Sequence, residues 1–267
     1  MVFRVWCRAR LDAEITGASA VRVESSNVTM FTLEMPSGFC PLDEAHEVAV
    51  TVDGQKLTAP SPFSDRSWTA HFQKAGKVWS VAKSAEVSGL HKRHGLQGPV
   101  DDAFLDSFVF VSPTGTPMAQ GAAQWIAGEE KTAISEWRKQ FRGEAQVRDD
   151  KDITDADIAA SNLILWGDPG SNRVLAKIAD RLPVKWNGQT FSMGKESYTA
   201  ADHVPVLIFP NPLNPKKYVV LNSGFTFADF AAKSNSLQTP KLPDWAVMEI
   251  SARKVKAAGF FNEEWGM

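Results

Sequence analysis

The chain has 267 residues, of which 43% are hydrophobic and 22% are charged, and its formal net charge is -2 at pH 7. These proportions are typical of a globular protein with one large domain or two smaller ones, and the near-neutral charge argues against binding to nucleic acid or to a membrane surface. No apolar stretch approaches the roughly 18 residues that a membrane-spanning helix needs. Residues 1–10 lack the apolar core of a signal peptide.

Residues 1–83 predict a small all-β module. Short segments in which apolar and polar side chains alternate are separated by turn signals such as Asp53-Gly54 and Ala75-Gly76, and this arrangement is typical of a β-sandwich. Such a module more often binds or packs than catalyses. The strands expected from the alternation are residues 2–8, 20–24, 28–33, 47–52, 55–57, 68–74 and 77–81.

Residues 84–100 predict a linker, and residues 101–267 predict an α/β domain. Apolar strands at residues 107–111 and 163–166 are separated by helical periodicity, so we expect them to lie parallel with a right-handed crossover. The loop between the strands at 206–209 and 218–221 is too short for a helical crossover, so that pair should be antiparallel. The expected architecture is a mixed, mostly parallel sheet flanked by helices, similar to flavodoxin or Rossmann folds. The remaining expected elements are helices at 121–142, 155–160 and 172–181, a hairpin at 184–192 and a last strand at 246–250.

A turn at residues 167–172 follows the strand at 163–166 and is the expected position of a polar pocket. Ligands of open α/β sheets bind beyond the carboxyl ends of the strands, and the next helix begins here with free backbone N–H groups. If the strand at 206–209 runs parallel to 163–166, its loop meets the same edge. An anion or a sugar hydroxyl would suit such a pocket, although Asn and Asp are also ordinary turn residues. The expected substrate-binding residues are Ser112, Ser171, Asn172, Asn211 and Asn214, with Asp168 as the most reactive member.

Several carboxylates and one histidine are candidates for catalysis. Asp101 and Asp102 are adjacent, and mutual repulsion could separate their pKa values into those of an acid and a base. His203 precedes a core strand and is the best candidate for a general base. A glycosidase would draw its acid and base from Asp101, Asp102, Glu129, Glu130 and Asp168; a nucleophile set would join Ser223 and His203 to Asp202 or Asp229. The alternative for each residue is a structural role in a turn or a cap.

The histidines of His91-Lys92-Arg93-His94 lie close in sequence to Asp101 and Asp102, and these residue types can bind zinc. The glycine-rich surroundings indicate a solvated loop instead. We therefore expect no metal ion and no other cofactor.

Three segments resemble the C-terminal part of large bacterial proteins of the prolyl-oligopeptidase-like serine hydrolase group. They are residues 95–104, residues 162–172 and the stretch from Pro210-Asn211-Pro212 to Asn222-Ser223-Gly224-Phe225. The resemblance covers most of the chain and implies a catalytic α/β-hydrolase domain upstream, with a Gly-x-Ser-x-Gly nucleophile turn. This chain contains no Gly-x-Ser-x-Gly, so no catalytic residue of the group can be assigned in it. A periplasmic or extracellular location would follow if the parent protein is secreted.

Three functions remain open from the sequence, and whether the chain is an enzyme stays undecided. The first is a hydrolase or a hydrolase-derived domain that acts on ester, peptide or glycosidic bonds. The second is a glycoside hydrolase with a carboxylate acid/base pair. The third is a non-catalytic module that binds carbohydrate or a partner. The expected partners are a small-molecule or carbohydrate substrate, and an upstream catalytic domain or a second copy of the chain.

Overall fold

Residues 8–84, 89–226 and 242–267 are described by a computed structural model, in which the chain divides into two units, Met1–Val87 and Ser88–Met267. Each unit has its own hydrophobic core and is described by itself. Leu96 and Val100, from the segment expected as a linker, belong to the core of the second unit. Among the described residues, no helix has the length and apolar content to cross a membrane.

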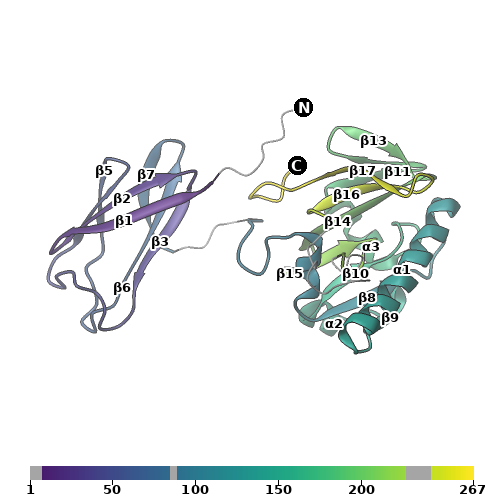
Figure 1. Ribbon diagram of the computed structural model, residues 1–267, viewed down its shortest axis with the longest axis horizontal. Helices are drawn as coiled ribbons and strands as arrows, with labels where there is room; N and C mark the ends of the chain where they lie inside the picture. Colours follow the sequence, from purple (N-terminus) through teal and green to yellow (C-terminus); the bar gives the residue numbers. More distant parts are fainter. Residues whose placement is uncertain (1–7, 85–88, 227–241) are drawn as a thin grey trace. The chain divides into compact units, whose positions relative to one another are not determined.

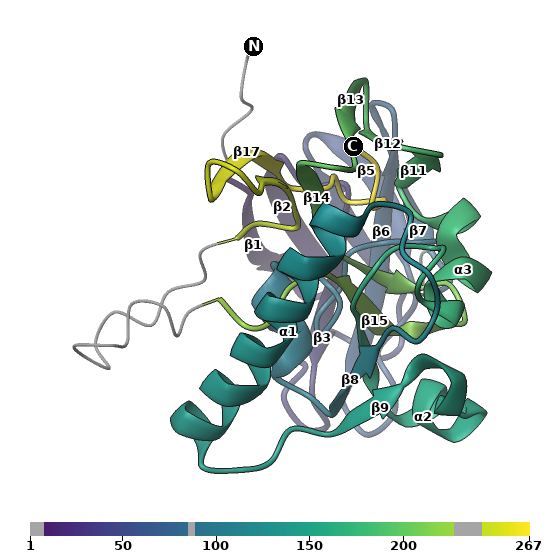
Figure 2. The same ribbon diagram turned by 90° about the vertical axis from the view of Figure 1, so that its right-hand side faces the viewer.

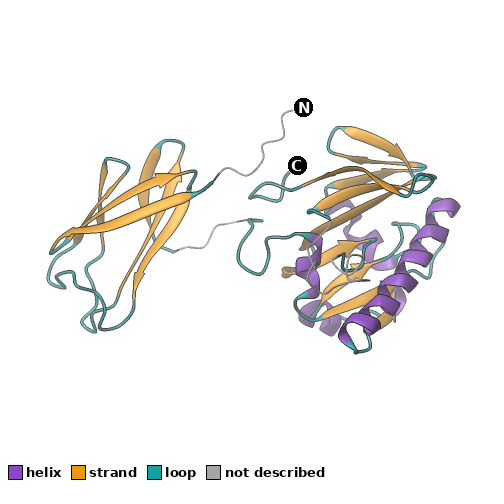
Figure 3. Cartoon of the chain, viewed as in Figure 1, coloured by secondary structure: helices purple, strands orange, loops and turns teal. Residues whose placement is uncertain are grey.

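The first unit consists of two β-sheets that enclose a core, as Figure 1 and Figure 3 show. One sheet has the strand order β1-β2-β4-β5, the other β3-β6-β7. Trp68, Phe72 and Trp79 are buried in this core, so the prediction of a β-sandwich-like module is confirmed. The strands are β1 (Arg10–Gly17), β2 (Ala20–Ser26), β3 (Met30–Met35), β4 (Val48–Val52), β5 (Gln55–Ala59), β6 (Trp68–Ala75) and β7 (Val78–Ala82).

Strand β1 was not predicted, because all eight of its residues are exposed and burial therefore imposes no apolar face on its sequence. The neighbouring strand β2 does alternate, with Val21 and Val23 buried and Arg22 and Glu24 exposed. The strand predicted at residues 2–8 falls almost wholly outside the described residues.

The second unit is built on a seven-stranded sheet with the order β17-β16-β14-β15-β10-β8-β9. Figure 2 shows α1 on one side of this sheet and α2 and α3 on the other. A separate antiparallel sheet contains β11, β12 and β13. The strands are β8 (Phe108–Ser112), β9 (Val147–Asp149), β10 (Asn162–Leu165), β11 (Val184–Asn187), β12 (Thr190–Met193), β13 (Glu196–Thr199), β14 (His203–Asn211), β15 (Asn214–Leu221), β16 (Trp245–Glu249) and β17 (Lys254–Gly259). The α-helices are α1 (Gln120–Phe141), α2 (Asp155–Ala160) and α3 (Arg173–Ile178), and the 3-10 helices are η1 (Val100–Phe104), η2 (Asp150–Asp152) and η3 (Ala179–Arg181).

The predicted α/β fold class is wrong. Strands make up 41% of the structure and helices 19%, and the sheets are mixed or antiparallel. Within the seven-stranded sheet, β8, β9, β10 and β15 are mutually parallel, whereas β14, β16 and β17 are antiparallel to their neighbours. Because α2 and α3 have only six residues each, they cannot cover the sheet as the helices of a flavodoxin-like fold do. The sheets are largely antiparallel after α3 because short turns join β11 to β12, β12 to β13, β14 to β15 and β16 to β17. Each of these pairs is therefore a hairpin instead of two parallel strands joined by a helix.

The strand directions contradict the assumption behind the predicted pocket, namely that the strand at 206–209 runs parallel to the strand at 163–166. Parallel pairing of β8 with β10 and antiparallel pairing of β14 with β15 agree with the sequence. On its other side, however, β10 pairs in parallel with β15 and not with β14, and Leu165 lies opposite Leu221. Strand β14 therefore runs opposite to β10. The loop after β14 consequently lies at the far edge of the sheet, and the residues after β15 lie beside the turn at 167–172.

Candidate functional site

The turn at residues 167–172 is held by its own side chains. Asp168 Oδ1 accepts hydrogen bonds from the backbone N–H groups of Gly170 and Ser171, both at 2.9 Å, and Asp168 Oδ2 accepts one from Met118 N at 2.9 Å. Ser171 Oγ accepts from Asp168 N at 2.9 Å and is itself buried. Asp168 and Ser171 thus fix the shape of the turn.

Asn172 is fully buried, and its side chain also holds the turn at residues 167–172 in place. Its Oδ1 atom caps α3 by accepting from Val174 N at 3.0 Å and Leu175 N at 3.1 Å. Its Nδ2 atom donates to Val111 O and Trp166 O. All the hydrogens that Asn172 can donate are therefore used within the protein, so the residue has none left for a ligand.

Asn211 and Asn214 lie at the opposite edge of the sheet, in the tight turn between β14 and β15. Asn211 Oδ1 accepts from Leu213 N at 2.9 Å, and Asn214 Nδ2 donates to Ile158 O at 2.9 Å. The structure does not bring these two residues to Asp168, because β14 runs antiparallel to the strand that the pocket required.

Asp101 and Asp102 point in different directions from η1. Asp101 is buried and accepts from both the backbone N–H and the hydroxyl of Thr226. Asp102 accepts from the hydroxyl of Tyr218, and burial together with this bond raises the pKa of Tyr218 above its usual range. The two carboxylates anchor separate segments, which is not the arrangement of an acid/base pair.

His203 and Ser223 lie near the same edge of the sheet but have different partners. His203 Nδ1 is 3.2 Å from Thr199 O and 3.3 Å from Thr199 Oγ1. Ser223 Oγ donates to Gly224 O at 2.8 Å. Asp202 accepts from the backbone N–H and hydroxyl of Ser251, which lower its pKa, and Asp229 lies outside the described residues.

Ser112 and the buried Glu130 form a hydrogen-bonded pair between β8 and α1. Ser112 Oγ donates to Glu130 Oε1. Burial raises the pKa of the Glu130 carboxyl, and Asp149 raises it further, while the bond from Ser112 opposes the shift. Glu130 therefore faces the sheet and is directed away from the cavity that the neighbouring Glu129 lines.

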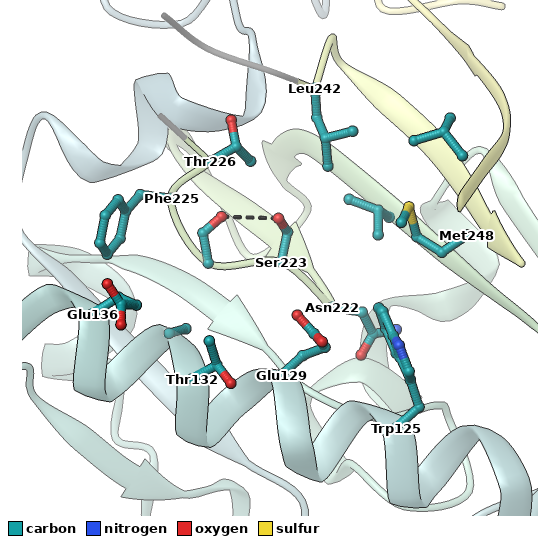
Figure 4. A pocket seen from close by; sticks show the side chains of 14 residues that line it. Trp125, Glu129, Thr132, Glu136, Asn222, Ser223, Phe225, Thr226, Leu242 and Met248 are labelled. Atoms are coloured by element: carbon teal, nitrogen blue, oxygen red, sulfur yellow. Dashed lines mark hydrogen bonds between the residues drawn. The ribbon is translucent and has the colours of Figure 1, made fainter. Parts of the chain in front are cut away.

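That cavity, of about 270 Å³, lies between α1 and the residues that follow β15. Figure 4 shows Glu129 pointing from α1 into it, with Phe225 at one end and Trp125 and Met248 at the other. One wall of the cavity is helical and partly acidic. The opposite wall combines apolar side chains of β14, β16 and β17 with the polar residues that follow β15. The cavity is lined by Trp125, Glu129, Thr132, Ala133, Glu136, Val206, Asn222, Ser223, Gly224, Phe225, Thr226, Leu242, Met248 and Val255.

Asn222 joins this cavity to the turn at 167–172. The Asn222 side chain is buried, accepts from Gly167 N at 2.8 Å, and donates to Gly167 O at 3.0 Å and Pro205 O at 3.2 Å. It fixes the point at which the chain leaves β15, and so positions Ser223 and Phe225.

Sequence reasoning missed most of the cavity residues, although a signal was present. Trp125, Glu129, Thr132 and Glu136 are spaced by four, three and four residues, the spacing that places side chains on one face of a helix. This face is partly polar, so its periodicity is a weaker signal than that of the apolar positions of α1, which pack on the sheet.

Comparison with protein-family models, curated proteins and solved structures finds no match. Within residues 8–84, 89–226 and 242–267, no three His, Cys, Asp or Glu side chains come together in a group that could hold a metal ion.

Proposed function

We propose that this chain is a hydrolase-derived, non-catalytic domain that binds a small amphipathic molecule in the cavity beside α1. The observation that carries the proposal is the cavity itself, in which an apolar wall from β14, β16 and β17 faces Glu129 and Glu136 on α1. Binding sites for small molecules are concave and mostly apolar, with a few polar groups that orient the ligand. A volume of about 270 Å³ suits a small molecule rather than a polymer.

The binding role is favoured over catalysis by the bonds of the candidate catalytic residues. Asp101, Asp102 and Asp168 each accept hydrogen bonds that hold the fold. Of the carboxylates considered for a glycosidase, Glu129 is the one that lines this cavity. The resemblance to the C-terminal part of prolyl-oligopeptidase-like hydrolases is consistent with an accessory role, since the nucleophile turn of that group is absent from this sequence.

Ligand-observed NMR with a fragment library tests the proposal on the full chain. Thr132 is exposed and lines the cavity, whereas Ser135 is exposed elsewhere on α1. We expect fragments that bind the wild type to lose binding in Thr132→Phe and to keep it in the matched control Ser135→Phe. Nitrophenyl esters and nitrophenyl glycosides should not be turned over. Turnover above the buffer rate, or binding that Thr132→Phe leaves intact, would contradict the proposal.

A further inference from the structure

Strand β1 forms one edge of the four-stranded sheet in the first unit (Figure 1). It pairs with β2 on one side, and no strand among the described residues pairs with its other side. Natural sheets commonly protect such an edge with proline, with lysine or by keeping the strand very short. Strand β1 has eight residues and contains neither proline nor lysine, so its outer backbone groups are suited to pairing with a further strand.

One face of β1 is apolar and yet exposed. Leu11, Ala13 and Ile15 alternate with polar residues along the strand. Ala13 lies opposite Val23 of β2, and Ile15 lies opposite Val21, so these side chains share one face of the sheet. Val21 and Val23 are buried in the core of the unit, whereas Leu11 is 37% exposed and Ile15 is 44% exposed. Burial within the unit does not account for the apolar residues of β1, but cover by a further strand would.

The opposite face of β1 carries its charges in two blocks. Arg8 and Arg10 are followed by Asp12 and Glu14, and all four residues are exposed. This order is self-complementary when the strand pairs antiparallel with a copy of itself. If Leu11 lies opposite Leu11 of the second copy, Arg10 lies opposite Asp12 and Arg8 opposite Glu14, each pair occurring twice. A shift of the register by one pair in either direction places Asp12 opposite Asp12 or Arg10 opposite Arg10, and like charges directly opposite are destabilising.

The ion pairs within one copy are compatible with this pairing. Arg10 contacts Asp12 at 2.6 Å, and Arg22 Nη1 lies 4.0 Å from Glu14 Oε2. Arg10 uses two N–H groups on Asp12, whereas a guanidinium has five, and each carboxylate oxygen can accept more than one hydrogen bond. Between 54% and 72% of each of these four side chains is exposed. A second copy can therefore extend these pairs into a network without breaking them.

We propose that β1 is a docking edge for a second copy of this chain, which adds its own β1 antiparallel, with Leu11 on the two-fold axis. Two sheets of four strands then continue as one sheet of eight. In strand addition, backbone hydrogen bonds supply affinity and alternate side chains supply specificity. Here the ion pairs lie on one face, and Leu11, Ala13 and Ala9 of the two copies meet on the other. A two-fold interface uses the same patch on both copies and must be self-complementary, as the charge order of β1 is. The interface is independent of the cavity beside α1.

Sedimentation velocity of the full chain, from about 5 µM to about 300 µM, tests the pairing, because an interface of this small size gives a concentration-dependent dimer. Arg10→Glu turns two attractive pairs into repulsive ones and should raise the dimer dissociation constant about tenfold or more. Arg10→Glu combined with Asp12→Arg restores opposite charges in the same register and should restore the wild-type constant. Lys56→Glu is the matched control, because it makes the same change of charge at an exposed position of β5, the opposite edge of the same sheet, and it should leave the constant unchanged.

The remaining outcomes overturn the proposal. A wild-type chain that stays monomeric over the whole concentration range shows that β1 does not bind a second copy. A dimer that Arg10→Glu leaves as strong as the wild type, or that Lys56→Glu weakens equally, places the interface elsewhere. A dimer that Arg10→Glu weakens and the double variant does not restore excludes the antiparallel register with Leu11 on the axis.

Discussion

Asp244 lies directly against the backbone of Gly98. The Asp244 side chain is fully buried, and a Cβ atom added to Gly98 would lie 2.1 Å from Asp244 Oδ1. Gly98 also has a φ of +75°, a conformation that residues with a side chain rarely adopt. Lys92 and Phe261 N donate to Asp244 Oδ2, so the carboxylate cannot move aside without losing these bonds.

Gly98→Ala is therefore expected to destabilise the second unit by more than backbone conformation alone explains. Gly95 is a matched control because its φ is +74° and nothing lies within 4 Å of an added Cβ atom. Gly95→Ala should cost about 1 kcal/mol, and Gly98→Ala at least about 2 kcal/mol more because of the steric clash. Urea denaturation of both variants measures the difference. Equal losses would mean that Asp244 yields to the new methyl group without cost.

Asn222→Ala is expected to lower the free energy of unfolding by about 3 kcal/mol, because it leaves buried groups of Gly167 and Pro205 without partners. Asn187 is exposed, and Asn187→Ala should change stability by less than about 0.5 kcal/mol. Urea denaturation compares the two. A loss in Asn222→Ala as small as in the control would show that water replaces the amide, and that the exit from β15 is not held by this side chain.

Glu130→Gln is expected to stabilise the second unit at neutral pH. Burial raises the pKa of Glu130, so the folded chain binds this proton more tightly than the unfolded chain does. The contribution of Glu130 to stability is thus fully present below its unfolded pKa and is lost as pH rises through the higher folded pKa. Glutamine keeps an oxygen acceptor for Ser112 and carries no charge.

Urea denaturation at a series of pH values from about pH 4, near the ordinary pKa of a glutamate, to about pH 8 measures this effect. The wild type should lose more stability over that interval than Glu130→Gln does. Glu144→Gln, which removes a carboxylate on the surface, should follow the wild type. A Glu130→Gln variant that is less stable than the wild type at the higher pH would mean that the charged form is favoured by its neighbours.

Local periodicity was enough to predict the elements whose sequence carries one strong signal. Helix α1 and strand β10 were predicted within about two residues, since a 22-residue amphipathic segment and a continuous apolar run depend little on their surroundings. Whether two strands lie parallel depends on tertiary pairing that is distant in sequence. Strand β15 pairs with β10 across more than fifty residues, and neither sequence contains a feature that specifies this pairing.

The site was harder to predict because turn residues and binding residues have the same chemistry. Asp168 and Asn172 have the side chains expected of a polar pocket, and the structure uses both to satisfy backbone groups. The distinction lies in where each hydrogen bond ends. Conversely, Trp125 and Glu136 are ordinary helix residues in the sequence, and only the path of β14 and β16 turns their face of α1 into a cavity wall.

Ser223 is expected not to act as a nucleophile, although it lies in the cavity and near the same sheet edge as His203. A serine nucleophile needs a base within hydrogen-bond reach to accept its proton. The hydrogen of Ser223 is directed to Gly224 O, and His203 Nδ1 is bonded to Thr199. A fluorescent phosphonate that labels activated serines should therefore give no adduct with the full chain, as judged by intact mass. A phosphonate adduct that disappears in Ser223→Ala and in His203→Gln would instead show that the two side chains meet in solution, and would restore a serine hydrolase mechanism at this edge.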